Sequence, residues 1–298
     1  MKKTVLLIFV LFSIATFAQN ATEVYLFDLI KNDSTNTYSL KNPINISDNV
    51  GFYDNQPSFL NDGSGVLFAS TRDGQTDVAL YNIADETKSW LTNTLANEYS
   101  PIQTPNRKFF SAIKLEDDET QLLWIYPFSR RKEKVLIENL TVGYHVWIDK
   151  TMVVSFVLND PPTLEVSNLK YKIKYPIEKN IGRSILKIPT TSLISFISQE
   201  HADLEIYSIN PVNSEKEYIA DALEGSQDMA WTPDKTIVMG KGNKLFKLKP
   251  GEDESWIEIA SLEEFKLDGI TRLSISPLGT KIAIVIDEVV EEASESNE

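Results

Sequence analysis

The chain has few side chains suited to metal chemistry. Among its 298 residues there are two histidines, His145 and His201, and no cysteine. Transition-metal sites are built from clustered His, Cys and carboxylate ligands, whereas these histidines lie far apart and belong to no H-x-x-x-H pattern. We therefore predict no metal site and no cofactor. We expect His201, in the polar turn QEHADLE, to be solvated.

Hydrolytic chemistry has equally little support. A serine hydrolase of the common type needs a G-x-S-x-G nucleophile elbow, and the sequence has none. Two carboxylate pairs, Asp117–Asp118 and Glu263–Glu264, are of the type that can cleave glycosidic bonds. Both pairs lie in segments with the character of exposed loops, where carboxylates are the norm. We therefore predict no catalytic residues and a protein that is not an enzyme.

The elements that would position any site are short strands in a repeated order. Starting from Phe59, equivalent positions recur at intervals of 39–45 residues, and each begins a unit of strand, polar turn, strand and two further strands. The six equivalent positions are Phe59, Gln103, Trp147, Leu186, Trp231 and Ile275. Four-stranded units of this length, repeated six times, predict an all-β fold, a six-bladed β-propeller.

The sixth repeat lacks its two outer strands, because an acidic tail follows the segment IAIVID. Two strand-like segments, TEVYLFDLI (residues 22–30) and TYSLKNPINIS (residues 37–47), are left over near the other end of the chain. We predict that these N-terminal strands pair with the C-terminal repeat, complete the last blade and close the ring without exposed sheet edges. The predicted propeller spans residues 23–286.

Circular closure would place a polar ring at the mouth of the central channel. The first strand of each blade lines the channel, and the residue three positions before each equivalent site stands at the start of that strand. These residues are Gln56, Ser100, Tyr144, Arg183, Asp228 and Arg272, with His145 beside them. Two interpretations remain open: a wet channel end is polar by default, or the mouth binds a partner segment or a small ligand. We expect Trp147 and Trp231 to be buried.

The two ends of the chain differ in composition from the propeller. Residues 1–18 combine Lys2 and Lys3 with an apolar run and small residues before Ala18, which predicts a signal peptide cleaved after Ala18. No later segment has the length and apolarity of a membrane span. Residues 287–298, DEVVEEASESNE, carry six acids and no base, which predicts a disordered acidic tail.

The charge of the chain excludes some classes of partner. The formal net charge is −14, and loss of Lys2 and Lys3 with the signal peptide would make it −16. Nucleic acids and anionic membrane surfaces both favour clustered Lys and Arg, so we expect neither as a partner. An exported chain without disulfides is typical of a bacterial cell envelope. We predict a periplasmic or extracellular monomer.

One repeat carries a motif of a known family. Its residues are Pro57-x-Phe59, Asp62-Gly63, Ser70-x-Arg72-x-Gly74 and Asp77-x-x-x-Tyr81. This run resembles the WD-type repeat of TolB-like propellers and of the propeller domains of prolyl oligopeptidases. Six blades use the chain that follows the signal peptide, so we expect a propeller alone, without the N-terminal α/β domain of TolB or a hydrolase domain.

Within this motif, Arg72 and Asp77 stand on opposite arms of the turn between the second and third strands. We predict that they form a charge-assisted pair that fixes the turn, with a structural role rather than a ligand-binding one. Asp73-Gly74 supplies the turn itself, because both residues tolerate positive φ.

The resemblance implies a periplasmic role near envelope complexes that contact peptidoglycan-associated lipoprotein. The leading hypothesis is an exported, non-enzymatic propeller that acts as a protein-interaction platform in the bacterial cell envelope, with an envelope or secreted protein as its partner. The alternative is a glycan- or small-ligand-binding propeller, or a propeller enzyme that acts on extracellular polysaccharide. The alternative predicts aromatic residues and paired carboxylates at one channel mouth.

Overall fold

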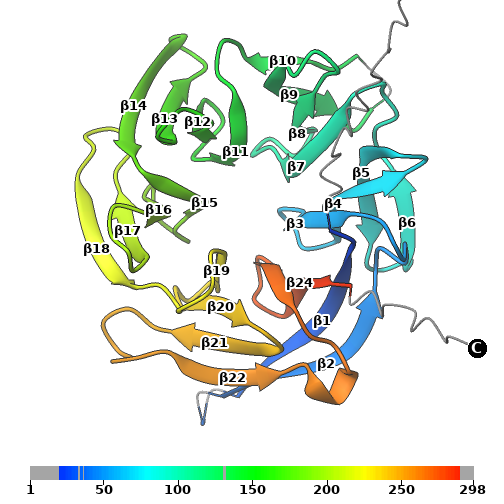
Figure 1. The fold of residues 1–298 in the computed structure, drawn as a ribbon, viewed down its shortest axis with the longest axis vertical. Helices are drawn as coiled ribbons and strands as arrows, with labels where there is room; N and C mark the ends of the chain where they lie inside the picture. The colour runs from blue at the N-terminus through cyan, green and yellow to red at the C-terminus, as the bar shows by residue number, and fades with distance from the viewer. Residues whose placement is uncertain (1–19, 33, 36, 130–131, 289–298) are drawn as a thin grey trace, which may run out of the picture.

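The computed structural model describes residues 20–32, 34–35, 37–129 and 132–288. Across these ranges, 24 strands form six antiparallel four-stranded sheets, and the one helical element is the 3-10 helix η1 (Glu263–Phe265). The sheets are arranged around a central axis as the blades of a propeller (Figure 1). The predicted all-β fold, a six-bladed propeller, is confirmed.

Three blades built from consecutive strands make up the first part of the ring, with the first strand of each nearest the centre. Blade 1 contains β3 (Asp54–Phe59), β4 (Gly65–Arg72), β5 (Gln75–Asn82) and β6 (Thr87–Trp90). Blade 2 contains β7 (Asn97–Gln103), β8 (Phe109–Leu115), β9 (Gln121–Pro127) and β10 (Lys134–Ile137). Blade 3 contains β11 (Val142–Trp147), β12 (Met152–Val157), β13 (Thr163–Asn168) and β14 (Ile173–Lys179).

The remaining three blades complete the ring. Blade 4 contains β15 (Ile181–Lys187), β16 (Ile194–Ser198), β17 (Glu205–Ile209) and β18 (Lys216–Asp221). Blade 5 contains β19 (Met229–Trp231), β20 (Ile237–Lys241), β21 (Lys244–Leu248) and β22 (Ile257–Ser261). Blade 6 combines two segments of the chain and contains β23 (Ile270–Ile275), β24 (Lys281–Asp287), β1 (Thr22–Asn32) and β2 (Thr37–Asn45).

Blade 6 closes the circle. Its strands β1 and β24 pair from Thr22 opposite Asp287 to Asp28 opposite Lys281, and they lie side by side in Figure 1. The Nζ of Lys281 lies 2.6 Å from Oδ1 of Asp28 at the end of this ladder. The predicted closure by N-terminal strands that pair with the C-terminal blade is therefore confirmed.

The middle strands are apolar on both faces, because each blade is covered by a neighbour on either side. In β24, Ile284 packs with Val238 of blade 5, whereas Val285 points the other way and packs with Phe68 of blade 1. This alternation follows from the two-residue period of a strand. The outer strands face solvent and carry many exposed residues, as in β14 and β18.

Blades 5 and 6 approach each other closely at Gly240 in β20. A Cβ atom added to Gly240 would lie 2.3 Å from Cγ2 of Ile270 in β23, which is far inside van der Waals contact. The missing side chain of Gly240 therefore allows the two sheets to pack closely. Its φ lies outside the left-handed region, so the glycine is not required for backbone conformation.

The ends of the described chain meet beside the closing strands. Asp287, which the sequence analysis assigned to the acidic tail, is the last residue of β24, and the N–H of Glu288 donates to the carbonyl of Ala21 at 3.0 Å. The predicted signal peptide, residues 1–18, and residues 289–298 of the tail lie outside the described residues. In the part of the chain that is described, no helix is long and apolar enough to pass through a bilayer.

Candidate functional site

A cavity of 720 Å³ lies along the channel, between the inner strands of all six blades. Its lining includes every mouth residue predicted from the sequence: Gln56, Ser100, Tyr144, His145, Arg183, Asp228 and Arg272. Their convergence follows from ring closure, because one repeat position in every blade faces the same end of the channel. The volume falls in the range of small-ligand sites, roughly 300–1,000 Å³.

Bulges at the starts of the inner strands set the direction of the mouth side chains. The register of β3 against β4 shifts between Asn55 and Ser58, and β7 has a corresponding shift. Gln56 and Ser100 fall within these bulges with φ of 57° and 50°, the left-handed region that non-glycine residues seldom adopt. The Oε1 of Gln56 accepts a hydrogen bond from the N–H of Ser100 at 2.6 Å, which connects the two bulges.

Two arginines share one carboxylate in blades 4, 5 and 6. The Nε of Arg183 donates to Oδ2 of Asp228 at 3.0 Å, and its Nη2 contacts the same oxygen. The Nε of Arg272 lies 4.0 Å from the other oxygen, Oδ1. Asp228 is only 7 % exposed, so these are charge-assisted contacts with a largely buried acid.

Arg272 also contacts Tyr144 across the channel, since blades 6 and 3 stand opposite each other in a ring of six. Its Nη2 donates to the hydroxyl of Tyr144 at 3.2 Å, and its guanidinium carbon lies 5.1 Å from the ring centroid. Burial opposes the charge on Arg272, but the Asp228 carboxylate and Tyr144 outweigh it and raise the pKa of Arg272. The guanidinium therefore stays cationic.

The cavity lining has a charge opposite to that of the whole chain. Among the described residues that line it, Arg183, Lys187 and Arg272 are cationic and Asp228 is the one acid. The chain as a whole has a formal net charge of −14. A local excess of positive charge in a concave site attracts anions.

His145 is directed into the contact between blades 2 and 3. Its Nε2 lies 2.7 Å from Oγ of Ser111 in β8, and Nε1 of Trp147 donates to the same oxygen at 2.9 Å. The imidazole is 2 % exposed, and burial lowers the pKa of His145 to about 3, so the ring is neutral. The structure thus gives His145 a packing position beside the mouth, and its part in binding stays a prediction.

The other residues considered for metal or acid–base chemistry do not converge. The side chain of His201 is 66 % exposed, as its turn sequence predicts. Asp117–Asp118 and Glu263–Glu264 lie in a turn and in η1, away from the channel lining. Within the described ranges, no group of three or more His, Cys, Asp or Glu side chains is placed to hold a metal ion.

Three aromatic side chains near the mouth were missed or misplaced by sequence reasoning. Trp231, expected to be buried, is partly exposed and lines the cavity, while its Nε1 donates to Oγ of Ser195 at 2.8 Å. Tyr53 and Tyr99 meet edge to face with centroids 6.2 Å apart. Burial raises the pKa of Tyr53, and the charge of Arg272 acts against this shift.

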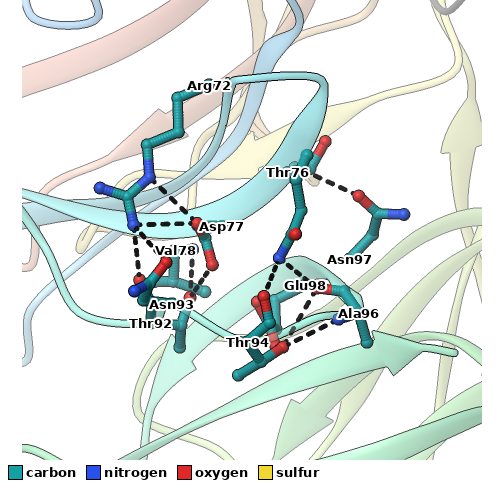
Figure 2. Close-up of polar contacts among 11 residues, drawn as sticks. Arg72, Thr76, Asp77, Val78, Thr92, Asn93, Thr94, Ala96, Asn97 and Glu98 are labelled. Atoms are coloured by element: carbon teal, nitrogen blue, oxygen red, sulfur yellow. Dashed lines mark hydrogen bonds and ion pairs between the residues drawn. The ribbon is translucent and has the colours of Figure 1, made fainter.

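The predicted pair of Arg72 and Asp77 is present beside the β4–β5 turn (Figure 2). Both Nε and Nη2 of Arg72 donate to Oδ2 of Asp77 at 3.1 Å. Nη2 also donates to the carbonyl of Thr92 at 3.2 Å, and the hydroxyl of Thr92 donates to Oδ1 of Asp77 at the same distance. The pair therefore connects the turn to the segment that leads from blade 1 to blade 2.

A second buried carboxylate lies next to this pair. Glu98, in β7, is fully buried and accepts a hydrogen bond from the hydroxyl of Thr94 at 2.5 Å (Figure 2). The hydroxyl of Tyr126 lies 3.5 Å from the same oxygen. Burial and the nearby charge of Asp77 raise the pKa of Glu98 to about 7.

No protein-family model and no curated protein sequence matches the chain. Among solved structures, it is similar to a putative TolB from Agrobacterium tumefaciens, with 13 % identity and a TM-score of 0.68 over 92 % of this chain and 100 % of that chain. TolB from Acinetobacter baumannii is also similar, with 10 % identity and a TM-score of 0.57 over 89 % of this chain and 64 % of that chain. The chain has a TolB-like propeller fold.

The TolB-like propeller is similar to an enzyme structure as well. An oligogalacturonate lyase from Vibrio parahaemolyticus has 15 % identity and a TM-score of 0.53 over 90 % of this chain and 98 % of that chain. At such identities the likeness shows the fold alone, and the function has to be argued from the site.

The motif that carried the resemblance has local structural roles in this TolB-like propeller. Asp73 and Gly74 have φ of 51° and 78°, so both adopt the left-handed conformation of a tight hairpin between β4 and β5. Arg72 and Asp77 flank that hairpin on the rim of blade 1. None of the seven mouth residues belongs to the motif, although Pro57 and Phe59 of the motif line the same cavity. The motif therefore indicates the fold and does not indicate a ligand.

Proposed function

We propose that this TolB-like propeller is an exported, non-enzymatic protein whose channel mouth binds a partner protein of the bacterial cell envelope or a secreted one. The observation that carries the proposal is the convergence of polar side chains from all six blades on one 720 Å³ cavity. The proposed location is the periplasm or the cell exterior, in keeping with the signal peptide predicted from the sequence.

The construction of the mouth supports a binding role. Gln56 and Ser100 hold a left-handed backbone, which costs free energy of about 1–3 kcal/mol per residue and is maintained here by the bulges of β3 and β7. Both residues sit on strands of a closed ring, so the mouth is rigid and needs little ordering when it binds. The fold similarity to two TolB structures is in keeping with a binding propeller.

The absence of cysteine allows the channel to be blocked at a single chosen position. Ser274 in β23 lines the cavity and is partly exposed, whereas Ser89 in β6 is exposed on an outer strand. We would label S274C and S89C with the same bulky maleimide, immobilise each protein, and capture partners from an envelope extract of the source bacterium. Mass spectrometry would identify the captured proteins.

A partner held by the mouth is expected to bind the unlabelled protein and labelled S89C, and to be lost from labelled S274C. Unlabelled S274C controls for the substitution itself and is expected to retain the partner. Equal capture by labelled S274C and labelled S89C would show that the channel is not the binding site and would overturn the proposal.

A second candidate is a glycan- or small-ligand-binding propeller, or a propeller enzyme that acts on extracellular polysaccharide. The specific observation in its favour is the partly exposed Trp231 beside polar groups in a cavity of ligand size, since aromatic faces stack on sugars. The similar lyase structure is named for an acidic oligosaccharide substrate. A thermal-shift screen against glycans and divalent cations tests this candidate, and a saturable hit lost in labelled S274C would favour it over a protein partner.

A further inference from the structure

We infer that the channel mouth recognises a carboxylate side chain of the partner protein, with Arg183 and Arg272 as its cationic contacts. This inference rests on the proposed function and specifies the chemistry of the same site. It distinguishes an acidic partner segment from a neutral or basic one.

The two arginines retain unused hydrogen-bond donors. Each guanidinium has five N–H groups. Arg183 directs two of its nitrogens at Asp228, and Arg272 bonds to the hydroxyl of Tyr144 through Nη2. In the described ranges, no other acceptor bonds to either guanidinium, although both side chains line the cavity. The remaining donors are available to an anion.

The balance of charge favours an acidic group over a basic one. Arg183, Arg272 and Lys187 outnumber Asp228 in the described lining, so the cavity has an excess of positive charge. Arg272 is held cationic, and its side chain is only 15 % exposed, which weakens screening by water and salt. A carboxylate would reduce this excess, whereas a basic side chain would add to it.

The cavity lining also contains a hydroxyl that has no partner in the described part of the chain. Ser100 is 7 % exposed, and its Oγ has no hydrogen-bond partner among the described residues. Buried polar atoms are nearly always satisfied, so an orphan in a cavity wall calls for a ligand or a water molecule.

Asp228 shows that a carboxylate fits the local geometry. Arg183 already holds one of its oxygens through two nitrogens, a charge-assisted contact between a guanidinium group and a carboxylate. A partner carboxylate would meet the donors that Asp228 leaves free and would compete with Asp228 for Arg183. Removal of the Asp228 charge is therefore expected to strengthen binding of an acidic ligand. The same change would weaken binding of a basic ligand.

The probe for this inference is an acetylated and amidated hexaglutamate peptide, with hexaglutamine as the neutral control and glutarate as a small dicarboxylate. Isothermal titration at 0.15 M salt would compare the mature protein with R183Q, R272Q and D228N. K244Q, in an exposed ion pair between β21 and β22, is the matched charge control. We expect hexaglutamate to bind saturably, more tightly than glutarate, and hexaglutamine not to bind.

The variants give opposite expected effects. R183Q and R272Q should each weaken hexaglutamate binding at least tenfold, D228N should strengthen it about threefold, and K244Q should leave it unchanged. If R272Q does not fold, R183Q and D228N still decide the matter, since Arg183 is the more exposed arginine.

Several results would overturn the inference: no saturable hexaglutamate binding, equal binding of hexaglutamine, wild-type affinity in R183Q, or weaker binding in D228N. Glutarate binding as tightly as the peptide would make a small carboxylate the ligand instead. If labelled S274C loses its captured partner while R183Q and R272Q keep it, the proposed function stands and the carboxylate inference is wrong. If labelling S274C has no effect on capture, the proposed function itself fails.

Discussion

The Nε2 of His145 lies 2.7 Å from Oγ of Ser111, and this contact joins β11 of blade 3 to β8 of blade 2. Because Trp147 donates to the same hydroxyl, one serine receives two side chains from the next blade. A related contact recurs where Nε1 of Trp231 in β19 donates to Ser195 in β16. Contacts between a first strand and the second strand of the preceding blade thus help hold the ring together.

The burial of His145 predicts a loss of stability in acid. Its pKa is about 3 in the folded protein against an ordinary value of 6.5, so between these values the unfolded chain binds a proton that the folded chain does not. The stability that the buried neutral imidazole contributes is complete above about pH 6.5 and is lost as the pH falls below that value. Urea unfolding between pH 4 and pH 8 should show wild type losing more stability than H145Q on acidification. Parallel pH profiles would contradict a buried neutral imidazole.

Glu98 predicts the opposite trend. Burial raises its pKa to about 7 from an ordinary 4.5, so the folded protein holds a proton that the unfolded chain releases. The contribution is complete below about pH 4.5 and is lost as the pH rises to about 7. Relative to wild type, E98Q should therefore gain stability between pH 5 and pH 8. E258Q, on exposed β22, is the control and should follow the wild-type profile.

Closure of blade 6 predicts a large effect of truncating Phe27. This side chain is fully buried in β1 and packs against Phe265 with centroids 5.3 Å apart. F27A should lower the free energy of unfolding by about 3–5 kcal/mol, through lost burial and the cavity left behind. I30A, at a position 44 % exposed on the same strand, should cost less than about 1 kcal/mol in the same denaturation experiment. Similar costs for both would argue against a packed β1.

The close approach at Gly240 predicts that a single methyl group will separate blades 5 and 6. G240A should cost about 1–3 kcal/mol because the new Cβ would overlap Ile270. G182A is the matched control, since its Cβ would find its nearest neighbours at 3.5 Å. The double variant G240A/I270A should lose less unfolding free energy than the sum of the losses in G240A and I270A. Strict additivity would mean that the two residues do not meet.

The Arg72–Asp77 pair predicts a coupling that a double-mutant cycle can measure. R72M leaves a carboxylate that is 1 % exposed without its cationic partner and should cost about 1–3 kcal/mol. Once Asp77 is replaced by Asn, the same R72M change should cost clearly less. Thermal unfolding of wild type, R72M, D77N and the double variant gives the coupling free energy between the two residues. A coupling free energy near zero would mean that the pair does not stabilise the fold.

The repeat spacing was enough to predict the fold because each blade must bring the same strand to the same place in the ring. The two leftover strand-like segments predicted how blade 6 is completed. Unpaired strand edges are costly, so these segments were expected to pair with the last repeat. The mouth residues were predicted from the same repeat, because they occupy one equivalent position in each blade. Gln56 and Arg272 are far apart in sequence and yet line one cavity. The periodic spacing therefore located the cavity lining and did not indicate a ligand.

The sequence failed where side-chain direction depends on local register. Tyr144 and His145 are adjacent, and the sequence analysis placed both at the mouth. Successive side chains in a strand point to opposite faces, so the imidazole contacts Ser111 while the tyrosine contacts Arg272. Tyr53 and Tyr99 occupy different positions in their repeats and carry no common spacing. The bulges that orient the mouth depend on pairing between strands, which no single segment reveals.

The seam in blade 6 also determines when folding can finish. Asp28 and Lys281 touch although 253 positions separate them, so the second edge of β1 is covered only when the distant strand β24 pairs with it. Until β1 and β24 pair, that edge stays open to other strands and to proteases. Protection of this edge therefore depends on a pairing between the two ends of the propeller.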